Sequence, residues 1–177
     1  NPGNEYRCFA LDHQQENDFF ITAFHPILGN PEIIHHIVLY RLPENDLPDH
    51  DPALGWDCID DMGGQGEGMI AAWAPGALPV EFDGTKGIKV GTDERLVVQM
   101  HYFHNGSATG TLSDDSGYAL RITDTVETEL RMWPFGDRGF TIPAGDDNYS
   151  HDYEFGIPAL LESIDPDATI TVYATGP

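Results

Sequence analysis

Two consecutive histidines, His35 and His36, stand inside the apolar, β-branched run of residues 33–40. This composition predicts an interior strand, and burying two imidazoles side by side costs free energy unless their nitrogens find partners. A metal ion would satisfy both rings. Hydrogen bonds to backbone carbonyls are the alternative for a pair of core histidines, and the pair alone leaves both interpretations open.

A third histidine, His101, lies in a second strand-like run, residues 96–103. If the two strands are neighbours, three imidazoles can converge, and three neutral imidazoles with an open position suit copper or zinc. Successive side chains of a strand point to opposite faces. His35 and His36 can therefore share one ion only at a bulge or a strand end, or through different ring nitrogens.

The other histidines are not predicted to be ligands. His104 follows His101 by three residues, so we expect it on the other face of the strand and exposed to solvent. The remaining four lie in polar, turn-rich segments, where a solvated surface histidine is expected: His13, His25, His50 and His151. The sequence also lacks the His-Glu-x-x-His pattern of hydrolytic zinc sites.

The elements that must position these residues are short strands. Apolar or alternating runs separated by Gly, Pro, Asn and Asp predict an all-β fold, an antiparallel β-sandwich or jelly roll. The predicted strands are residues 5–10, 19–24, 33–40, 87–90, 95–103, 118–122, 128–133 and 168–174. The best helix candidate, residues 158–163, is short.

Charge excludes some functions. The 177-residue chain has 30 acidic against 8 basic residues and a formal net charge of -22, which repels phosphate backbones and anionic lipid surfaces. We therefore expect neither a nucleic-acid nor a membrane partner. No stretch approaches the roughly 18 to 20 apolar residues of a membrane span, and we interpret the dispersed acidic residues as a solvated surface rather than as calcium sites.

The two cysteines, Cys8 and Cys58, fit either one disulfide in an oxidising compartment or two unrelated buried thiols. Cys58 lies in a long acidic, Pro/Gly-rich excursion, residues 43–68. A bridge would tie this excursion to the first strand. By closing a loop of about 50 residues it would contribute about 3 to 4 kcal/mol on the chain-entropy estimate.

Five segments, taken in order and approximate spacing, resemble the first catalytic-core domain of the copper type II, ascorbate-dependent monooxygenases. This family includes peptidylglycine α-hydroxylating monooxygenase and dopamine β-hydroxylase. The segments are Glu-Tyr-Arg-Cys at 5–8, the histidine pair at 35–36, Cys58, Ala-Ala-Trp-Ala-Pro-Gly at 71–76 and Leu-Val-Val-Gln-Met-His-Tyr at 96–102. The resemblance covers roughly residues 4–145.

The resemblance implies a jelly-roll β-sandwich in which three histidines bind one copper ion, which accepts electrons from ascorbate or another one-electron donor. It also implies a disulfide between the two cysteines, a secreted, periplasmic or extracellular location, and two residues near the copper site. The implied ligands are His35, His36 and His101, the disulfide is Cys8–Cys58, and the neighbours are Tyr6 and Gln99.

Three features depart from the family pattern. Ile37 replaces the methionine that usually follows the histidine pair, and the cysteines of a second disulfide seen in animal enzymes are absent. The family's dioxygen-activating copper requires a His-x-His motif and a later methionine in a second sandwich domain. This sequence contains no His-x-His. We expect those ligands to follow Pro177.

We therefore expect residues 1–134 to form the first copper domain, and residues 135–177 to form a linker and the first strands of a second, incomplete β-sandwich. The complete enzyme would use dioxygen to hydroxylate a C–H bond of a substrate that the sequence does not identify. This chain alone is expected to bind and cycle copper without hydroxylating. The alternatives are a non-catalytic copper-binding or copper-delivery module and a structural β-sandwich whose histidines are satisfied in its core.

Overall fold

The regular structure of the described residues consists of ten β-strands and one short 3-10 helix. The computed structural model describes residues 3–58, 68–104, 112–132, 139–154 and 171, and no α-helix occurs among them. The elements are β1 (Asn4–Leu11), β2 (Phe19–Ile27), β3 (Ile34–Pro43), η1 (Glu44–Asp46), β4 (Trp56–Asp57), β5 (Met69–Trp73), β6 (Val80–Glu81), β7 (Lys86–Val90), β8 (Glu94–Phe103), β9 (Gly117–Thr123) and β10 (Thr128–Leu130).

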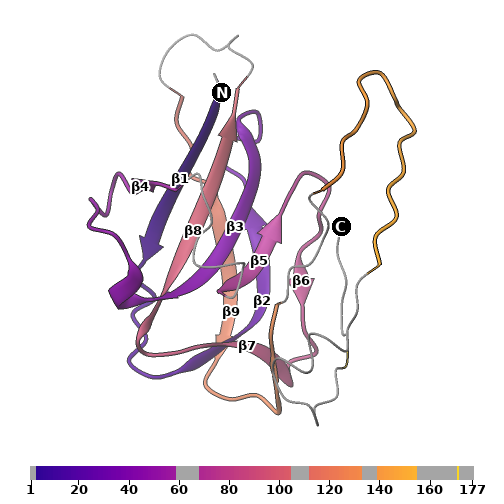
Figure 1. Ribbon diagram of the computed structural model, residues 1–177. Coiled ribbons are helices and arrows are strands. Elements are labelled where there is room, and N and C mark those ends of the chain that lie inside the picture. Colours follow the sequence, from indigo (N-terminus) through magenta and orange to yellow (C-terminus); the bar gives the residue numbers. More distant parts are fainter. Residues whose placement is uncertain (1–2, 59–67, 105–111, 133–138, 155–170, 172–177) are drawn as a thin grey trace. The chain divides into compact units, whose positions relative to one another are not determined.

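The first sheet has the strand order β4-β1-β8-β3-β5, and all of its pairs are antiparallel. Its central strand is β8, flanked along most of its length by β1 and β3, as Figure 1 shows. Side chains alternate across this strand. Val98 and Met100 point into the protein, whereas Gln99 and His101 lie on the opposite, outer face of the sheet.

The second sheet has the order β10-β7-β2-β6, and β9 also pairs with β2. The pair β7–β10 is parallel, with Thr128 opposite Lys86, whereas the other strand pairs of the described residues are antiparallel. A parallel pair needs a long crossover connection. The chain supplies one because β8, in the other sheet, and β9 both come between β7 and β10.

The main hydrophobic core lies between the two sheets. Phe19, Ile21 and Val90 of the second sheet pack with residues of the first sheet, including Leu39 and Leu96, and each of these side chains is at most 3% exposed. Burial of this kind is the dominant favourable contribution to folding. The prediction of an all-β protein with two packed sheets is confirmed, whereas the jelly-roll order of connections stays a prediction.

The excursion that begins at residue 43 covers part of the outer face of the first sheet. Leu47 and Trp56 pack there over Val97 of β8, next to Cys8 and Cys58. The Arg7 guanidinium of β1 also donates to the carbonyl oxygen of Leu54. This sheet is therefore apolar on both faces, and its outer face carries a small second core.

The predicted strands up to residue 133 all overlap observed ones, and their ends coincide with the observed ends or differ from them by at most three residues. The structure adds β4, β5 and β6, which had not been predicted as strands. The chain divides into two compact units, Asn1–Pro134 and Phe135–Pro177, and the ten strands lie in the first.

The beginning of a second sandwich stays a prediction. Residues 139–154 contain no strand. The predicted strand 168–174, apart from Thr171, and the helix candidate 158–163 lie outside the described residues. Within the described part of the chain, no helix has the length and apolar character needed to cross a membrane.

Candidate metal centre

Three histidines converge on the outer face of the first sheet. His35 and His36 lie at the start of β3, and His101 lies near the end of the antiparallel neighbour β8, with His36 directly opposite His101. One ring nitrogen from each histidine lies within 4.8 Å of the others. The Nδ1 atom of His36 is 3.1 Å from Nδ1 of His35 and 3.2 Å from Nδ1 of His101.

A β-bulge makes this convergence possible. The pairing of β3 with β8 shifts between Ile34 and His36, so His35 has no opposite residue. An extra residue of this kind re-aims the neighbouring side chains, and here it lets two consecutive imidazoles turn toward one point. His35 is exposed, His36 is half-buried and His101 is only 5% exposed, so the group opens to solvent on the His35 side.

Strand β1 contacts His101 from two sides. Tyr6 is opposite His101 in the pairing of β1 with β8, and their rings stack with centroids 4.0 Å apart and an interplanar angle of 8°. Asn4 lies two residues earlier on the same face of the strand, and its Oδ1 atom is 2.8 Å from Nε2 of His101. Tyr6 thus lies beside the histidine group. Asn4 was not predicted, although its spacing from Tyr6 is a signal that could have found it.

Gln99 lies between the histidine group and the excursion. It shares the outer face of β8 with His101, and its side-chain amide donates to the carbonyl oxygen of Cys58 at 3.1 Å. Cys58 forms a disulfide with Cys8 across a sequence separation of 50 residues. The disulfide implied by the family resemblance is confirmed. It ties the excursion at Cys58 to β1, next to the strand that carries His101.

Burial favours the uncharged forms of His36 and His101 near neutral pH. Desolvation, followed by the proximity of His36 and His35, lowers the pKa of His101 from 6.5 to about 4. Desolvation and then His35 also lower the pKa of His36. A neutral imidazole keeps a lone pair for a metal ion, so the two enclosed rings are in the state that ligation requires.

The donor set fits one small transition-metal ion. Nitrogens that bind an ion at about 2.0 Å in near-tetrahedral geometry lie roughly 3.3 Å apart, close to the two Nδ1 separations observed. Three imidazoles without a thiolate or carboxylate favour copper or zinc over hard cations. The residues present therefore fit one copper ion.

The other histidines lie elsewhere. His104 is exposed just after β8, as predicted, and His151 is exposed as well. His13 was expected to be a solvated surface residue but is half-buried, because its ring packs on Phe19 and its Nε2 atom lies 3.2 Å from a carbonyl oxygen. His25 and His50 are also half-buried. His25 is hydrogen-bonded to Glu81, and the ring of His50 lies beside that of Trp56.

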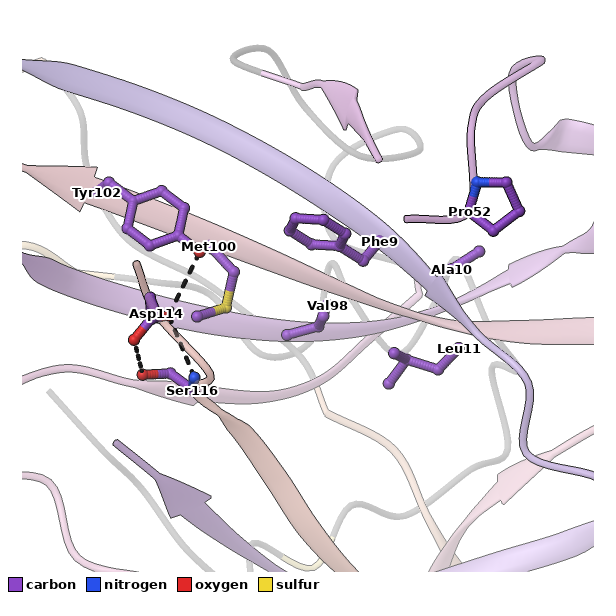
Figure 2. Close-up of a pocket in the computed structure, with 9 residues that line it drawn as sticks. All are labelled: Phe9, Ala10, Leu11, Pro52, Val98, Met100, Tyr102, Asp114 and Ser116. Carbon is purple, nitrogen blue, oxygen red and sulfur yellow. Dashed lines mark hydrogen bonds between the residues drawn. The ribbon is translucent and has the colours of Figure 1, made fainter. Parts of the chain in front are cut away.

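A cavity of about 300 Å³ lies on the opposite face of β8 from the histidine group (Figure 2). Met100 and Tyr102, which flank His101 in the strand, line it together with Asp114. The Tyr102 hydroxyl donates to Asp114 at 3.3 Å, and burial, followed by this carboxylate, raises the pKa of Tyr102 to about 12. Because the cavity and the histidine group lie on opposite faces of β8, the cavity is separate from the histidine group.

The fold and the site together define a class: an all-β domain of two packed sheets whose outer face presents three imidazoles suited to a borderline metal ion. Comparison with known families gives the particular family. Residues 2–109 match the copper type II ascorbate-dependent monooxygenase, N-terminal domain. The chain belongs to this family, and the matching segment contains all three histidines, Tyr6 and both cysteines.

Proposed function

We propose that His35, His36 and His101 hold one copper ion, and that this domain transfers electrons within an ascorbate-dependent copper monooxygenase. The observation that carries the proposal is the close approach of the three rings, with Nδ1 of His36 lying 3.1 Å from Nδ1 of His35 and 3.2 Å from Nδ1 of His101. Copper bound there would alternate between Cu(I) and Cu(II), taking one electron at a time from ascorbate or another donor.

The surroundings of the histidines support this role. The exposed ring of His35 leaves one side of the group open to a small reductant, whereas burial and the stacked ring of Tyr6 restrain His101. Ligands that do not rearrange between oxidation states favour rapid electron transfer, since little reorganisation is needed.

Hydroxylation of a C–H bond by dioxygen is proposed for the complete enzyme only. In this proposal residues 1–134 are the copper domain, and residues 135–177 are a linker and the beginning of a second sandwich that would complete the active centre. The disulfide fits an oxidising compartment, which supports a secreted, periplasmic or extracellular location.

Copper titration followed by electron paramagnetic resonance tests the proposal. We expect one Cu(II) ion per chain with hyperfine coupling to nitrogen, and reduction of that ion by ascorbate. His101→Ala should lower copper affinity by more than tenfold. The matched control His50→Ala, which removes a half-buried histidine outside the group, should leave affinity unchanged.

Two results would contradict different parts of the proposal. Absence of nitrogen-coordinated Cu(II), or unchanged affinity in His101→Ala, would remove the copper site. Tight copper binding without reduction by ascorbate or another one-electron donor would instead leave a copper-binding or copper-delivery module and remove the electron-transfer role.

A further inference from the structure

We propose that Asn4 is a positioning residue that determines which nitrogen of His101 faces the metal ion. The inference deepens the proposed function and rests on it. It starts from one contact, because Oδ1 of Asn4 lies 2.8 Å from Nε2 of His101 while Nδ1 of the same ring lies 3.2 Å from Nδ1 of His36. The two nitrogens of this ring thus face different partners.

The chemistry of neutral imidazole assigns a proton to one of these nitrogens. One ring nitrogen carries a hydrogen and donates, and the other carries a lone pair and accepts. The amide oxygen of Asn4 can only accept, so Nε2 of His101 carries the hydrogen. The lone pair is then on Nδ1, which is the nitrogen directed at His36 and the centre of the group.

The backbone fixes the position of Asn4. Its neighbour Gly3 accepts a hydrogen bond from the His104 amide at 2.9 Å. Gly3 has φ +91°, and a Cβ atom at this residue would lie 2.2 Å from the His104 carbonyl oxygen. Only glycine allows this close approach. The start of β1 is therefore fastened to the end of β8, and the half-buried Asn4 amide is directed at the His101 ring.

The acceptor at Nε2 also adjusts the strength of the ligand. A hydrogen bond to the distal nitrogen raises the basicity of the metal-binding nitrogen, and a carboxylate does so more than a neutral amide. A more basic ligand stabilises Cu(II) relative to Cu(I). The copper reduction potential should therefore decrease in the order Asn4→Ala, wild type, Asn4→Asp.

The first test uses the metal-free protein. Long-range proton–nitrogen correlation spectra of the histidine rings distinguish the two neutral tautomers. The wild type and Asn4→Asp should show His101 with its hydrogen on Nε2, and Asn4→Ala should show a mixture of tautomers. The matched control Asn30→Ala, which removes a half-buried amide that donates to the Ser113 carbonyl oxygen rather than to a histidine, should match the wild type.

The second test uses the copper-loaded protein. Asn4→Ala should lower copper affinity about 10- to 100-fold, the usual effect of losing a partner of a metal-bound histidine. It should also raise the reduction potential, whereas Asn4→Asp should lower it. A residue that only supported the fold would shift both variants in the same direction, so opposite shifts distinguish positioning from stability.

The inference is overturned if His101 of the wild type carries its hydrogen on Nδ1, or if the potentials of the two variants do not move in opposite directions. Failure of the proposed function looks different. In that case the wild type binds no copper, the tautomer spectra still distinguish wild type from Asn4→Ala, and the role of Asn4 is reduced to restraining a core histidine.

Discussion

His101 is the most enclosed of the three histidines, at 5% exposure. Its ring is stacked on Tyr6 and bonded to Asn4, and its pKa is lowered to about 4, first by burial and then by the neighbouring histidines. These contacts fix a neutral ring before any metal arrives. Pre-organisation of this kind reduces the cost of binding, since the ligand need not be desolvated or ordered again.

At the scale of residues, the lowered pKa of His101 predicts how the stability of the metal-free protein depends on pH. Between about 4 and 6.5 the unfolded chain binds a proton at this residue and the folded chain does not. The contribution of His101 to the free energy of unfolding should therefore be complete above pH 6.5 and decrease as the pH falls toward 4. Urea unfolding at several pH values measures this slope.

The many carboxylates also titrate at low pH, so a variant must isolate the histidine. His101→Asn removes the group and should show a shallower decrease of unfolding free energy with acidification than the wild type. Equal slopes for the two proteins would show that His101 does not titrate differently in the folded and unfolded chains.

The residues of the site were predictable to different degrees. The three histidines were named from the sequence because residue type and family resemblance both indicated them, whereas Tyr6 was named from the resemblance alone. Asn4 was not, because its contact with His101 depends on the register in which β1 pairs with β8. Register is a tertiary property, so the two-residue spacing of Asn4 from Tyr6 indicates a shared face of the strand but not the residue that Asn4 contacts.

At the scale of elements, the excursion depends on one glycine where it approaches β1. Gly55 has φ +61°, and a Cβ atom there would lie 2.1 Å from the Cys8 carbonyl oxygen. Gly55→Ala should lower the free energy of unfolding by about 2 kcal/mol or more, since it combines an unfavourable left-handed conformation with a clash against backbone. Equilibrium denaturation measures the loss.

Gly84→Ala is the matched control for this change. Gly84 also has a positive φ of +86°, but no atom lies within 4 Å of its added Cβ. Its substitution should cost about 1 kcal/mol from conformation alone. If the two alanine variants were equally destabilised, the close approach of the excursion to β1 would contribute nothing to stability.

The longest strands were the easiest to predict. The ten-residue strands β3 and β8 carry clear apolar runs, whereas β4 and β6 are two residues long and have no periodicity to detect. They exist because β1 and β2 offer edges for pairing. The parallel pairing of β7 with β10 was missed for a related reason, since the order of strands in a sheet depends on the whole chain.

At the scale of the whole molecule, the net charge of -22 should influence how reductants reach the site. Ascorbate is an anion near neutral pH, and like charges slow association unless salt screens them. The rate of Cu(II) reduction by ascorbate should therefore increase with ionic strength. Stopped-flow measurements from about 10 mM to 500 mM salt, spanning Debye lengths of roughly 30 Å to a few ångströms, test this.

A neutral one-electron reductant is the control, and its rate should be nearly independent of salt. A rate with ascorbate that falls as salt increases would mean that a locally positive surface surrounds the proposed copper site despite the acidic net charge. Such a result would leave the proposed ligands unaffected and would contradict only the expected influence of net charge.

The bulge at His35 has a consequence for transferring this site to other proteins. In a regular strand, two consecutive histidines would direct one ring to the outer face and the other into the core between the sheets. Here the extra residue lets both rings reach the outer face, while Ile37 beyond it stays fully buried. If only the histidine pair were copied into a regular strand, one of the two imidazoles would be buried in the core and would not reach the other ring. The unit to transplant is the irregular pairing of β3 with β8.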